Sequence, residues 1–190
     1  MRITAGYLKG QKILTTEGPG YRPATAKVRE ALFSMLTARG GIFSGCRVLD
    51  IFAGSGSLGI ESLSRGAGHA AFIEKSRKAA GLIRKNLQTL DVPTAEWHIW
   101  CADCKDVLSK PCSMPYDLIF IDPPYGHGLL PPVLELAVNN GWLAEDGLVC
   151  AEVESGVSAR ECVRELNLTE STDRTYGQTR IVIWENHKTA

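Results

Sequence analysis

No stretch of the 190-residue sequence approaches the roughly 18–20 consecutive apolar residues that a membrane span requires. The first six residues also lack the apolar core of a secretory signal. The sequence contains no internal repeat and no low-complexity tract. These absences exclude a membrane protein and a repeat protein. We expect a cytoplasmic globular protein, and the length suits one domain.

Cysteine is present, but not in the spacing that structural zinc sites need. Cys101 and Cys104 form a single C-x-x-C, with neither a second pair nor histidines at matching distances. Cys46 and Cys150 lie within apolar runs, where cysteine packs as a small hydrophobic residue. We therefore expect reduced cysteines and no bound metal, as is usual in the cytosol.

The chain has no excess of either charge, with 21 basic and 21 acidic residues. The charges are nevertheless unevenly placed. Residues 1–40 hold seven basic and two acidic residues, a net of +5, which leaves 14 basic and 19 acidic residues, a net of −5, in the remainder. A basic end on a neutral chain can contact the phosphates of a nucleic acid, although it can equally be a solvated surface.

The spacing of apolar residues predicts an α/β fold. Residues 2–14 form an expected arm or hairpin, and Thr25 precedes a helical stripe that ends at Gly40. Beyond Gly40, strands and helices alternate. We expect strands at 47–51, 70–74, 97–102, 116–121, 148–153 and 180–185. We expect helices that end near residue 64, that begin after Ser76, and that lie at 129–139 and 158–166. This alternation predicts a parallel sheet with helices on both faces, and in such sheets ligands bind beyond the carboxyl ends of the strands.

A glycine-rich loop follows the first expected strand. After Phe52 and Ala53 the sequence reads Gly-Ser-Gly-Ser-Leu-Gly, which places Gly54, Gly56 and Gly59 in a G-x-G-x-x-G between a strand and a helix. Glycines in this position permit a tight turn and a close approach of a cofactor to the backbone. Glu74 lies at the end of the second strand, where a carboxylate can accept hydrogen bonds from both ribose hydroxyls. The loop predicts a nucleoside-containing cofactor that these residues contact.

Asp50 discriminates between two such cofactors. A carboxylate just before the glycine turn would repel the pyrophosphate of a nicotinamide dinucleotide. It would attract the ammonium group of S-adenosylmethionine, which is therefore the favoured cofactor. Asp103, after the third strand, is a candidate acceptor for the adenine amino group.

The most specific signal is Asp122-Pro-Pro-Tyr125, which follows the fourth expected strand. The exocyclic amine of a base is a poor nucleophile because its lone pair is delocalised into the ring. The Asp122 carboxylate and the Pro123 carbonyl can hold both amino hydrogens, and Pro123 and Pro124 fix the backbone that presents them. Tyr125 can stack on a base that has left its helix. The element predicts methyl transfer to an amino group, with catalysis mainly by positioning.

A wider pattern extends over nearly the whole chain. It comprises RITAG at residues 2–6, KGQKI at 9–13, RPAT at 22–25, KVREALF at 27–33, AGSGSLGIESLSRG at 53–66 and NGWL at 140–143. Together with the Asp-Pro-Pro-Tyr element, this pattern resembles the RsmD family of bacterial methyltransferases. That family modifies the 2-amino group of one guanine in the 16S RNA of the small ribosomal subunit.

The resemblance implies a Rossmann-like class I methyltransferase core at 41–190, with a seven-stranded, mostly parallel sheet. Residues 1–40 would form an extension of the same domain that grips RNA within an assembling small subunit. By position it implies that Arg22, Thr25 and Arg29 line the site or touch phosphate. The chain departs from the family here, because Ala26 and Lys27 replace the usual Asp and Arg.

Rival functions share part of this pattern. A DNA adenine amino-methyltransferase would use the same Asp-Pro-Pro-Tyr chemistry, but only about 40 residues precede the core, which leaves little room for a region that recognises DNA sequence. A methyltransferase acting on glutamine side chains of proteins uses a similar element. An adaptor without catalysis would be expected to have lost the cofactor loop or the Asp-Pro-Pro-Tyr, and both are intact. A nicotinamide oxidoreductase requires Asp50 to point away from the ligand.

Overall fold

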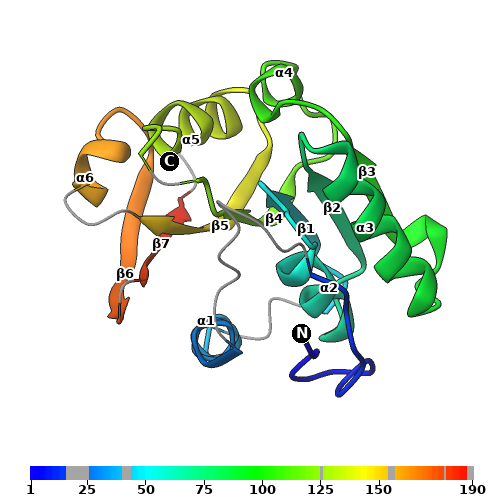
Figure 1. Cartoon of the computed structure of the whole chain (residues 1–190). Coiled ribbons are helices and arrows are strands. Elements are labelled where there is room, and N and C mark those ends of the chain that lie inside the picture. The colour runs from blue at the N-terminus through cyan, green and yellow to red at the C-terminus, as the bar shows by residue number, and fades with distance from the viewer. Residues whose placement is uncertain (16–25, 40–43, 125, 154–156, 178, 188–190) are drawn as a thin grey trace.

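The computed structural model describes residues 1–15, 26–39, 44–124, 126–153, 157–177 and 179–187. Seven strands form one sheet in the order β3-β2-β1-β4-β5-β7-β6 (Figure 1). The strands are β1 Arg47–Ile51, β2 His69–Ile73, β3 Trp97–Trp100, β4 Tyr116–Ile121, β5 Leu143–Val153, β6 Leu168–Tyr176 and β7 Thr179–Asn186. Strands β1 to β5 pair in parallel, while β7 is antiparallel to both β5 and β6. The predicted α/β class and mostly parallel sheet are confirmed.

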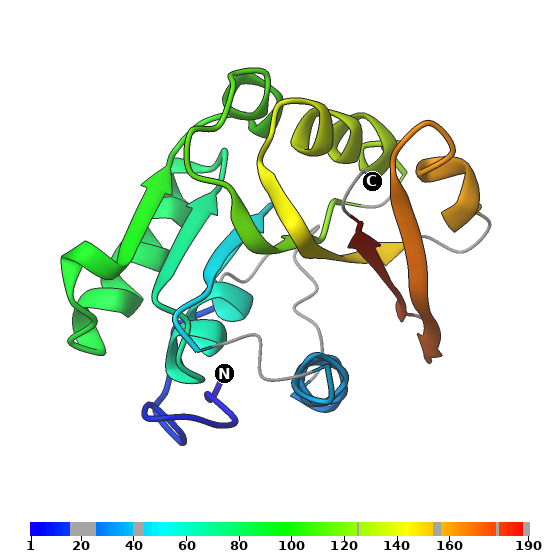
Figure 2. The same ribbon diagram turned by 180° about the vertical axis from the view of Figure 1, so that it is seen from behind.

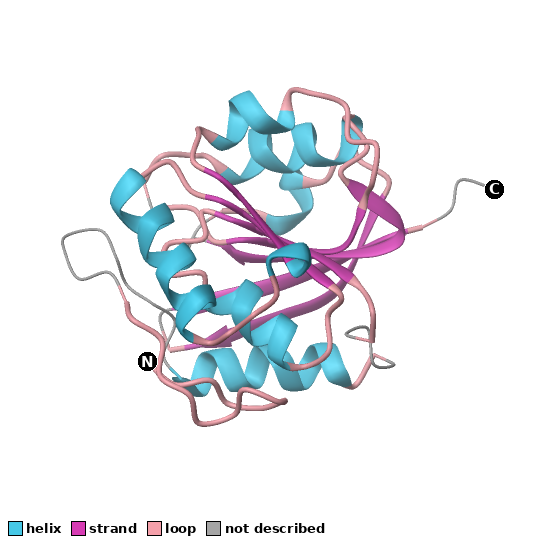
Figure 3. Ribbon diagram, turned by 90° about the vertical axis from the view of Figure 1, so that its right-hand side faces the viewer, coloured by secondary structure: helices cyan, strands magenta, loops and turns pink. Residues whose placement is uncertain are grey.

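Helices cover both faces of the sheet (Figure 3). They are α1 Ala26–Thr37, α2 Ser57–Ser64, α3 Arg77–Thr89, α4 Cys104–Leu108, α5 Leu130–Asn139 and α6 Ala159–Cys162, with a 3₁₀ turn at Thr94–Glu96. Apolar residues of α1, α2 and α3 belong to the core on one face, and those of α4, α5 and α6 belong to the core on the other. Within the described residues, no helix is long and apolar enough to cross a membrane.

The central strands are buried because helices cover them from both sides. Every residue of β1 except Arg47 and every residue of β4 except Asp117 is buried, which matches their predominantly apolar sequences. Strand order reverses between β1 and β4, so the loops at their carboxyl ends diverge. This is the position at which α/β sheets bind ligands.

The N-terminal arm folds back on itself and then packs against α2. The backbone N–H of Ile3 donates to Gln11, and Arg2 pairs with Lys12 in an antiparallel bridge. A Cβ at Gly6, whose φ is 82°, would lie 1.6 Å from the carbonyl oxygen of Ser64, so only glycine fits this contact. The predicted arm thus forms part of the core face that α1 and α2 cover (Figure 2).

Three elements were not expected from the sequence, including the 3₁₀ turn at Thr94–Glu96, and two others differ by five residues from their expected lengths. Helix α4 and strand β6 had not been predicted, whereas β5 begins five residues earlier than the expected strand at 148–153. The helix expected at 158–166 begins as predicted, with Ser158 at its N-cap, but ends at Cys162 as the short α6. Strand β6 lies at the sheet edge and is mostly exposed, so its polar sequence lacks the apolar pattern that signals a strand.

Candidate active site

The loop between β1 and α2 turns sharply through left-handed backbone conformations. Phe52, Gly54 and Gly56 have φ values of 63°, 56° and 75°. A left-handed conformation is costly for a residue such as phenylalanine and clusters at ligand-binding sites. At Gly56 a Cβ would also lie 3.1 Å from a methyl carbon of Ile83, so glycine allows α3 to approach the loop. The loop therefore exposes backbone at the carboxyl end of β1.

Glu74 stabilises this loop from the end of β2. Its Oε2 accepts a hydrogen bond from the backbone N–H of Gly54 at 2.9 Å, and its Oε1 accepts one from the backbone N–H of Ser76 at 2.7 Å. The side chain is 7% exposed. A carboxylate offers about four acceptor positions, so Glu74 can hold the loop and also accept from two hydroxyl groups.

Asp50 is buried beneath the same loop. Its Oδ2 accepts a hydrogen bond from the backbone N–H of Gly59 at 3.0 Å. Burial raises the pKa of this carboxyl to about 8, and the charges of Asp122 and Glu74 act in the same direction. A cation placed beside Asp50 would restore its ionised form.

Gly59, which the sequence pattern predicted to contact the cofactor, lies where α2 packs against β2. A Cβ on Gly59 would lie 2.3 Å from Cε1 of Phe72, which shows that the missing side chain faces β2. Its backbone N–H is the donor to Asp50. Gly59 therefore permits close packing of α2 on the sheet, while its contact with a cofactor stays a prediction.

Asp103 lies at the N-terminus of α4, where one oxygen accepts from the backbone N–H of Lys105 at 3.0 Å. The other oxygen accepts from Nζ of Lys75 at 2.9 Å. The hydrogen bond from Lys75 lowers the pKa of Asp103. The carboxylate thus stays ionised beside the loop after β3, which suits an acceptor for an amino group.

Asp122 and Pro123 follow β4 directly, next to the loop that follows β1. The backbone N–H of Asp122 donates to the carbonyl of Ile51 at 3.5 Å. Burial raises the pKa of Asp122 to about 7, and the negative charge of Glu152 raises it further. Pro123 is buried and Pro124 is exposed, while Tyr125 lies outside the described residues.

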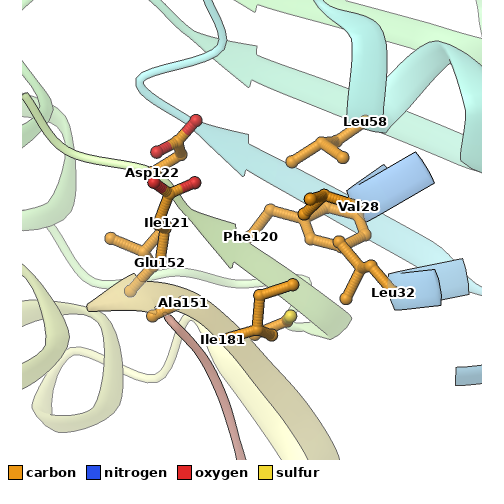
Figure 4. A pocket seen from close by; sticks show the side chains of 10 residues that line it. Val28, Leu32, Leu58, Phe120, Ile121, Asp122, Ala151, Glu152 and Ile181 are labelled. Atoms are coloured by element: carbon orange, nitrogen blue, oxygen red, sulfur yellow. The ribbon is translucent and has the colours of Figure 1, made fainter. Parts of the chain in front are cut away.

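A small pocket opens beside Asp122 (Figure 4). Val28 and Leu32 of α1 and Leu58 of α2 form an apolar wall, and the side chains of Asp122 and Glu152 lie at its other end. The remaining lining residues come from β4, β5 and β7: Phe120, Ile121, Cys150, Ala151 and Ile181. The pocket combines a surface on which a planar ring can pack with acceptors for its polar edge.

These residues fit S-adenosylmethionine. Backbone is presented at a left-handed turn, Glu74 offers acceptors for the ribose, and Asp50 offers a carboxylate that a nearby ammonium would stabilise. Asp103 lies at the end of the neighbouring strand β3. The structure brings these carboxylates to the carboxyl edge of three adjacent strands, as the sequence predicted for that edge.

The N-terminal residues predicted to bind substrate are only partly described. Arg22 and Thr25 lie outside the described residues. Arg29 is 1% exposed, and its guanidinium donates to the carbonyl of Arg2 at 2.9 Å and lies 3.9 Å from Glu61. A buried arginine needs such acceptors, and this one joins α1 to the arm and α2. The prediction that Arg29 touches substrate does not fit this placement.

The sequence analysis did not identify two carboxylates that contact residues of the site or of the N-terminal arm, Glu61 and Glu152. Glu61 lies within the AGSGSLGIESLSRG motif, but a buried acid in a helix carries no distinctive local signal. Glu152 lies near the carboxyl end of β5, a strand that also contains Glu145 and Asp146, so no local signal in the sequence distinguishes it.

The cysteines carry no sign of a metal site. All six are free, and Cys101 is exposed while Cys104 is buried. Among the residues that the structure describes, no group of three or more His, Cys, Asp or Glu side chains is arranged to hold a metal ion. Burial raises the pKa of the Cys104 thiol to about 11, so this thiol is not a ready thiolate.

Comparison with known proteins agrees with this geometry. The family model described as Conserved hypothetical protein 95 matches residues 1–185. The chain is 38% identical over 159 residues to ribosomal RNA small subunit methyltransferase D of Escherichia coli, covering 83% of this chain and 77% of the relative. The protein of the same name from Haemophilus influenzae is 32% identical over 187 residues, covering 98% and 94%.

Solved structures share the fold. The structure of the yhhF protein of Escherichia coli superimposes with a TM-score of 0.81 and 34% identity, covering 100% of this chain and 99% of the other. A precorrin-6y C5,15-methyltransferase from Geobacter metallireducens has a TM-score of 0.68 at 18% identity, covering 91% and 93%. The second likeness concerns the fold alone, which is the Rossmann-like class I methyltransferase fold.

Proposed function

The chain belongs to the RsmD family, described as Conserved hypothetical protein 95, and from this premise we propose that it methylates the 2-amino group of a guanine in 16S ribosomal RNA. The methyl donor is S-adenosylmethionine. The names of the relatives from Escherichia coli and Haemophilus influenzae support the small ribosomal subunit as the substrate, and action on subunits during assembly would place the protein in the cytoplasm.

The single observation that carries the proposal is the position of Asp122 and Pro123. They lie at the end of β4, beside the loop that Glu74 and Asp50 support at the ends of β2 and β1. A cofactor held by that loop and an amino group held by Asp122 would therefore meet at the switch point of the sheet. An amino group needs two acceptors, and a carboxylate followed by a proline carbonyl supplies both.

The chemistry requires little beyond alignment. Bound S-adenosylmethionine supplies an electrophilic methyl group on its sulfonium. The Asp122 carboxylate and the Pro123 carbonyl would hold the two amino hydrogens, which directs the nitrogen lone pair toward that methyl group. The pKa of Asp122, about 7, suits a group that is ionised near neutral pH and can take up the proton released from the amino nitrogen.

The test is transfer of labelled methyl groups to small ribosomal subunits isolated from cells that lack this protein, followed by nucleoside analysis. We expect label in 2-methylguanosine. Label in methyladenosine would overturn the choice of base, and an absence of label in RNA, with cofactor binding intact, would overturn the RNA substrate. Parallel assays with free 16S RNA and with DNA separate a particle substrate from the rival nucleic acids.

In the same assay, the variant Asp122→Ala separates methyl transfer from cofactor binding. The variant should bind S-adenosylmethionine and fail to transfer the methyl group, because the side chain follows β4 and is not the acceptor for the loop N–H groups. A loss of cofactor binding together with transfer would show that Asp122 supports the fold of the site instead of the substrate.

A further inference from the structure

Glu152 lies beside Asp122 on the neighbouring strand. Strands β4 and β5 are parallel, with Phe120 opposite Cys150 and Ile121 opposite Ala151. The next positions along this register are Asp122 and Glu152. Neighbouring strands are about 4.8 Å apart, and side chains two residues apart share one face of a sheet. Asp122 and Glu152 therefore share the face that carries Phe120 and Cys150.

The side chains confirm this arrangement. Both line the pocket, and Figure 4 shows their carboxyl groups next to one another at the end away from Val28 and Leu32. Each is partly exposed at the pocket. The charge of Glu152 acts on Asp122 strongly enough to raise its pKa, which agrees with the short separation.

Two adjacent carboxylates at one end of a pocket favour a ligand that carries hydrogen-bond donors at the edge facing them. The mechanism proposed above uses Asp122 and the Pro123 carbonyl for the amino group. It assigns no task to Glu152, although this residue faces the same space. A ligand that donates to both carboxylates presents an amino group and a second donor beside it.

We propose that Glu152 determines the base, accepting a hydrogen bond from N1–H of the target guanine while Asp122 holds its 2-amino group. This inference rests on the proposed function. The Watson–Crick edge of guanine carries the 2-amino group and N1–H side by side, and both are donors. Adenine carries an amino group beside an unprotonated N1, whose lone pair would face the Glu152 carboxylate. Glu152 thus favours guanine and disfavours adenine at the same atom.

The size of the discrimination follows from the charge of the acceptor. A hydrogen bond to a charged group corresponds to about a 10- to 100-fold effect, and a base that turns an acceptor toward the carboxylate suffers a larger loss. Replacing the carboxylate with an amide keeps the shape of the side chain and supplies an N–H₂ group that can donate to an unprotonated N1.

The experiment compares guanine with 2-aminopurine, which retains the 2-amino group but has an unprotonated N1. The guanine modified by the wild-type chain is first mapped, and small subunits are then reconstituted from ligated RNA that carries either base at that position. Initial rates are measured for the wild-type chain, for Glu152→Gln and for Glu135→Gln, which removes the same charge from the exposed face of α5. Thermal melting and cofactor titration verify that each variant is folded.

We expect the wild-type chain and Glu135→Gln to prefer guanine by at least about tenfold, and Glu152→Gln to reduce that preference by about tenfold or more. If Glu152 acted only through the pKa of Asp122, the rates for both bases would change by the same factor and their ratio would not change. An unchanged ratio in a folded Glu152→Gln variant overturns the inference. Absence of a mapped guanine would instead overturn the proposed function, so the two failures are distinguishable.

Discussion

Oε2 of Glu74 accepts a hydrogen bond from the backbone N–H of Gly54 at 2.9 Å, which ties the loop after β1 to the end of β2. We propose that the same carboxylate also accepts from the ribose hydroxyls, in which case Glu74 contributes to cofactor binding both directly and through the loop. Glu74→Ala should therefore weaken the binding of S-adenosylmethionine by about 1.5–3 kcal/mol, the value of a lost hydrogen bond to a charged group. Isothermal titration measures the affinity, and Glu135→Ala on the exposed face of α5 is the control. Equal affinities for Glu74→Ala and the wild-type chain would remove Glu74 from the cofactor site.

The pKa of Asp122 predicts how the rate depends on pH. Only the ionised Asp122 carboxylate can accept a hydrogen bond from the amino group and then take up its proton, so kcat/KM should rise with pH and level off above about 7. Because the charge of Glu152 raises this pKa, Glu152→Gln should move the midpoint to lower pH, whatever its effect on the absolute rate. Rate profiles of the two proteins between pH 5 and pH 9, an interval of about two pH units on each side of that value, measure the shift. A midpoint that stays at the same pH would contradict the coupling of the two carboxyl groups.

The raised pKa of Asp50 predicts that the cofactor-free protein becomes less stable as pH rises, whereas kcat/KM rises. Its pKa is raised in the fold to about 8, so between pH ~4 and ~8 the folded chain holds a proton that the unfolded chain has released. The free energy of unfolding should thus fall as pH rises through this window, by at most about 1.4 kcal/mol per pH unit for this group. Asp50→Asn keeps an oxygen acceptor for Gly59 and should flatten the dependence, whereas Asp106→Asn on exposed α4 should not. Urea unfolding at several pH values distinguishes the two results.

The sequence was most informative where burial on both faces leaves a simple pattern. Strands β1 and β4 match the predicted bounds to the residue, because a central parallel strand is buried on both faces and its sequence is predominantly apolar. The loop residues Gly54 and Glu74 could be placed at the same edge for a topological reason, since the carboxyl ends of parallel strands coincide. The edge strand β6 escaped prediction because its side chains mostly face solvent.

Contacts between distant segments were beyond what the sequence could reveal. Asp122 was recognised from its motif, but its neighbour Glu152 is identified only once the register of β4 and β5 is known. Arg29 was expected to line the site or touch phosphate because of its position in the family motif, whereas it is buried against Glu61 and the arm. The glycine pattern indicated Gly59 as a cofactor residue, while the structure shows that its lack of a side chain serves packing against Phe72.

Glu61 holds the N-terminal arm on α2, so its removal should destabilise the fold. Its carboxylate accepts hydrogen bonds from the backbone of Thr4 and Ala5 and from Nε of Arg65, and it lies beside the buried guanidinium of Arg29. Glu61→Ala leaves a buried positive charge without its partner, which costs about 3–5 kcal/mol. The exposed Glu30 of α1 offers a control, for which a change within about 0.5 kcal/mol is expected. Equal urea midpoints for the two variants would mean that the arm is not fixed by Glu61.

Substitution by alanine should change the free energy of unfolding in opposite directions at Gly59 and Gly81. A methyl group on Gly59 would lie 2.3 Å from Cε1 of Phe72, a ring carbon fixed within the core, so α2 must move away from β2. Gly59→Ala should therefore destabilise the protein by about 1–3 kcal/mol and, because the Gly59 N–H donates to Asp50, weaken cofactor binding as well.

Gly81 lies in α3, and a methyl group there meets no atom within 4 Å. Alanine in this helical position restricts the unfolded chain without a clash, so Gly81→Ala should stabilise the protein by about 0.4–1 kcal/mol. The midpoints of urea unfolding for both variants, at equal slope, measure the two effects. Both substitutions add one methyl group to a helix on the same face of the sheet. Opposite signs in the change of unfolding free energy would therefore report how closely α2 approaches the sheet. A Gly59→Ala variant more stable than the wild-type chain would contradict that close packing.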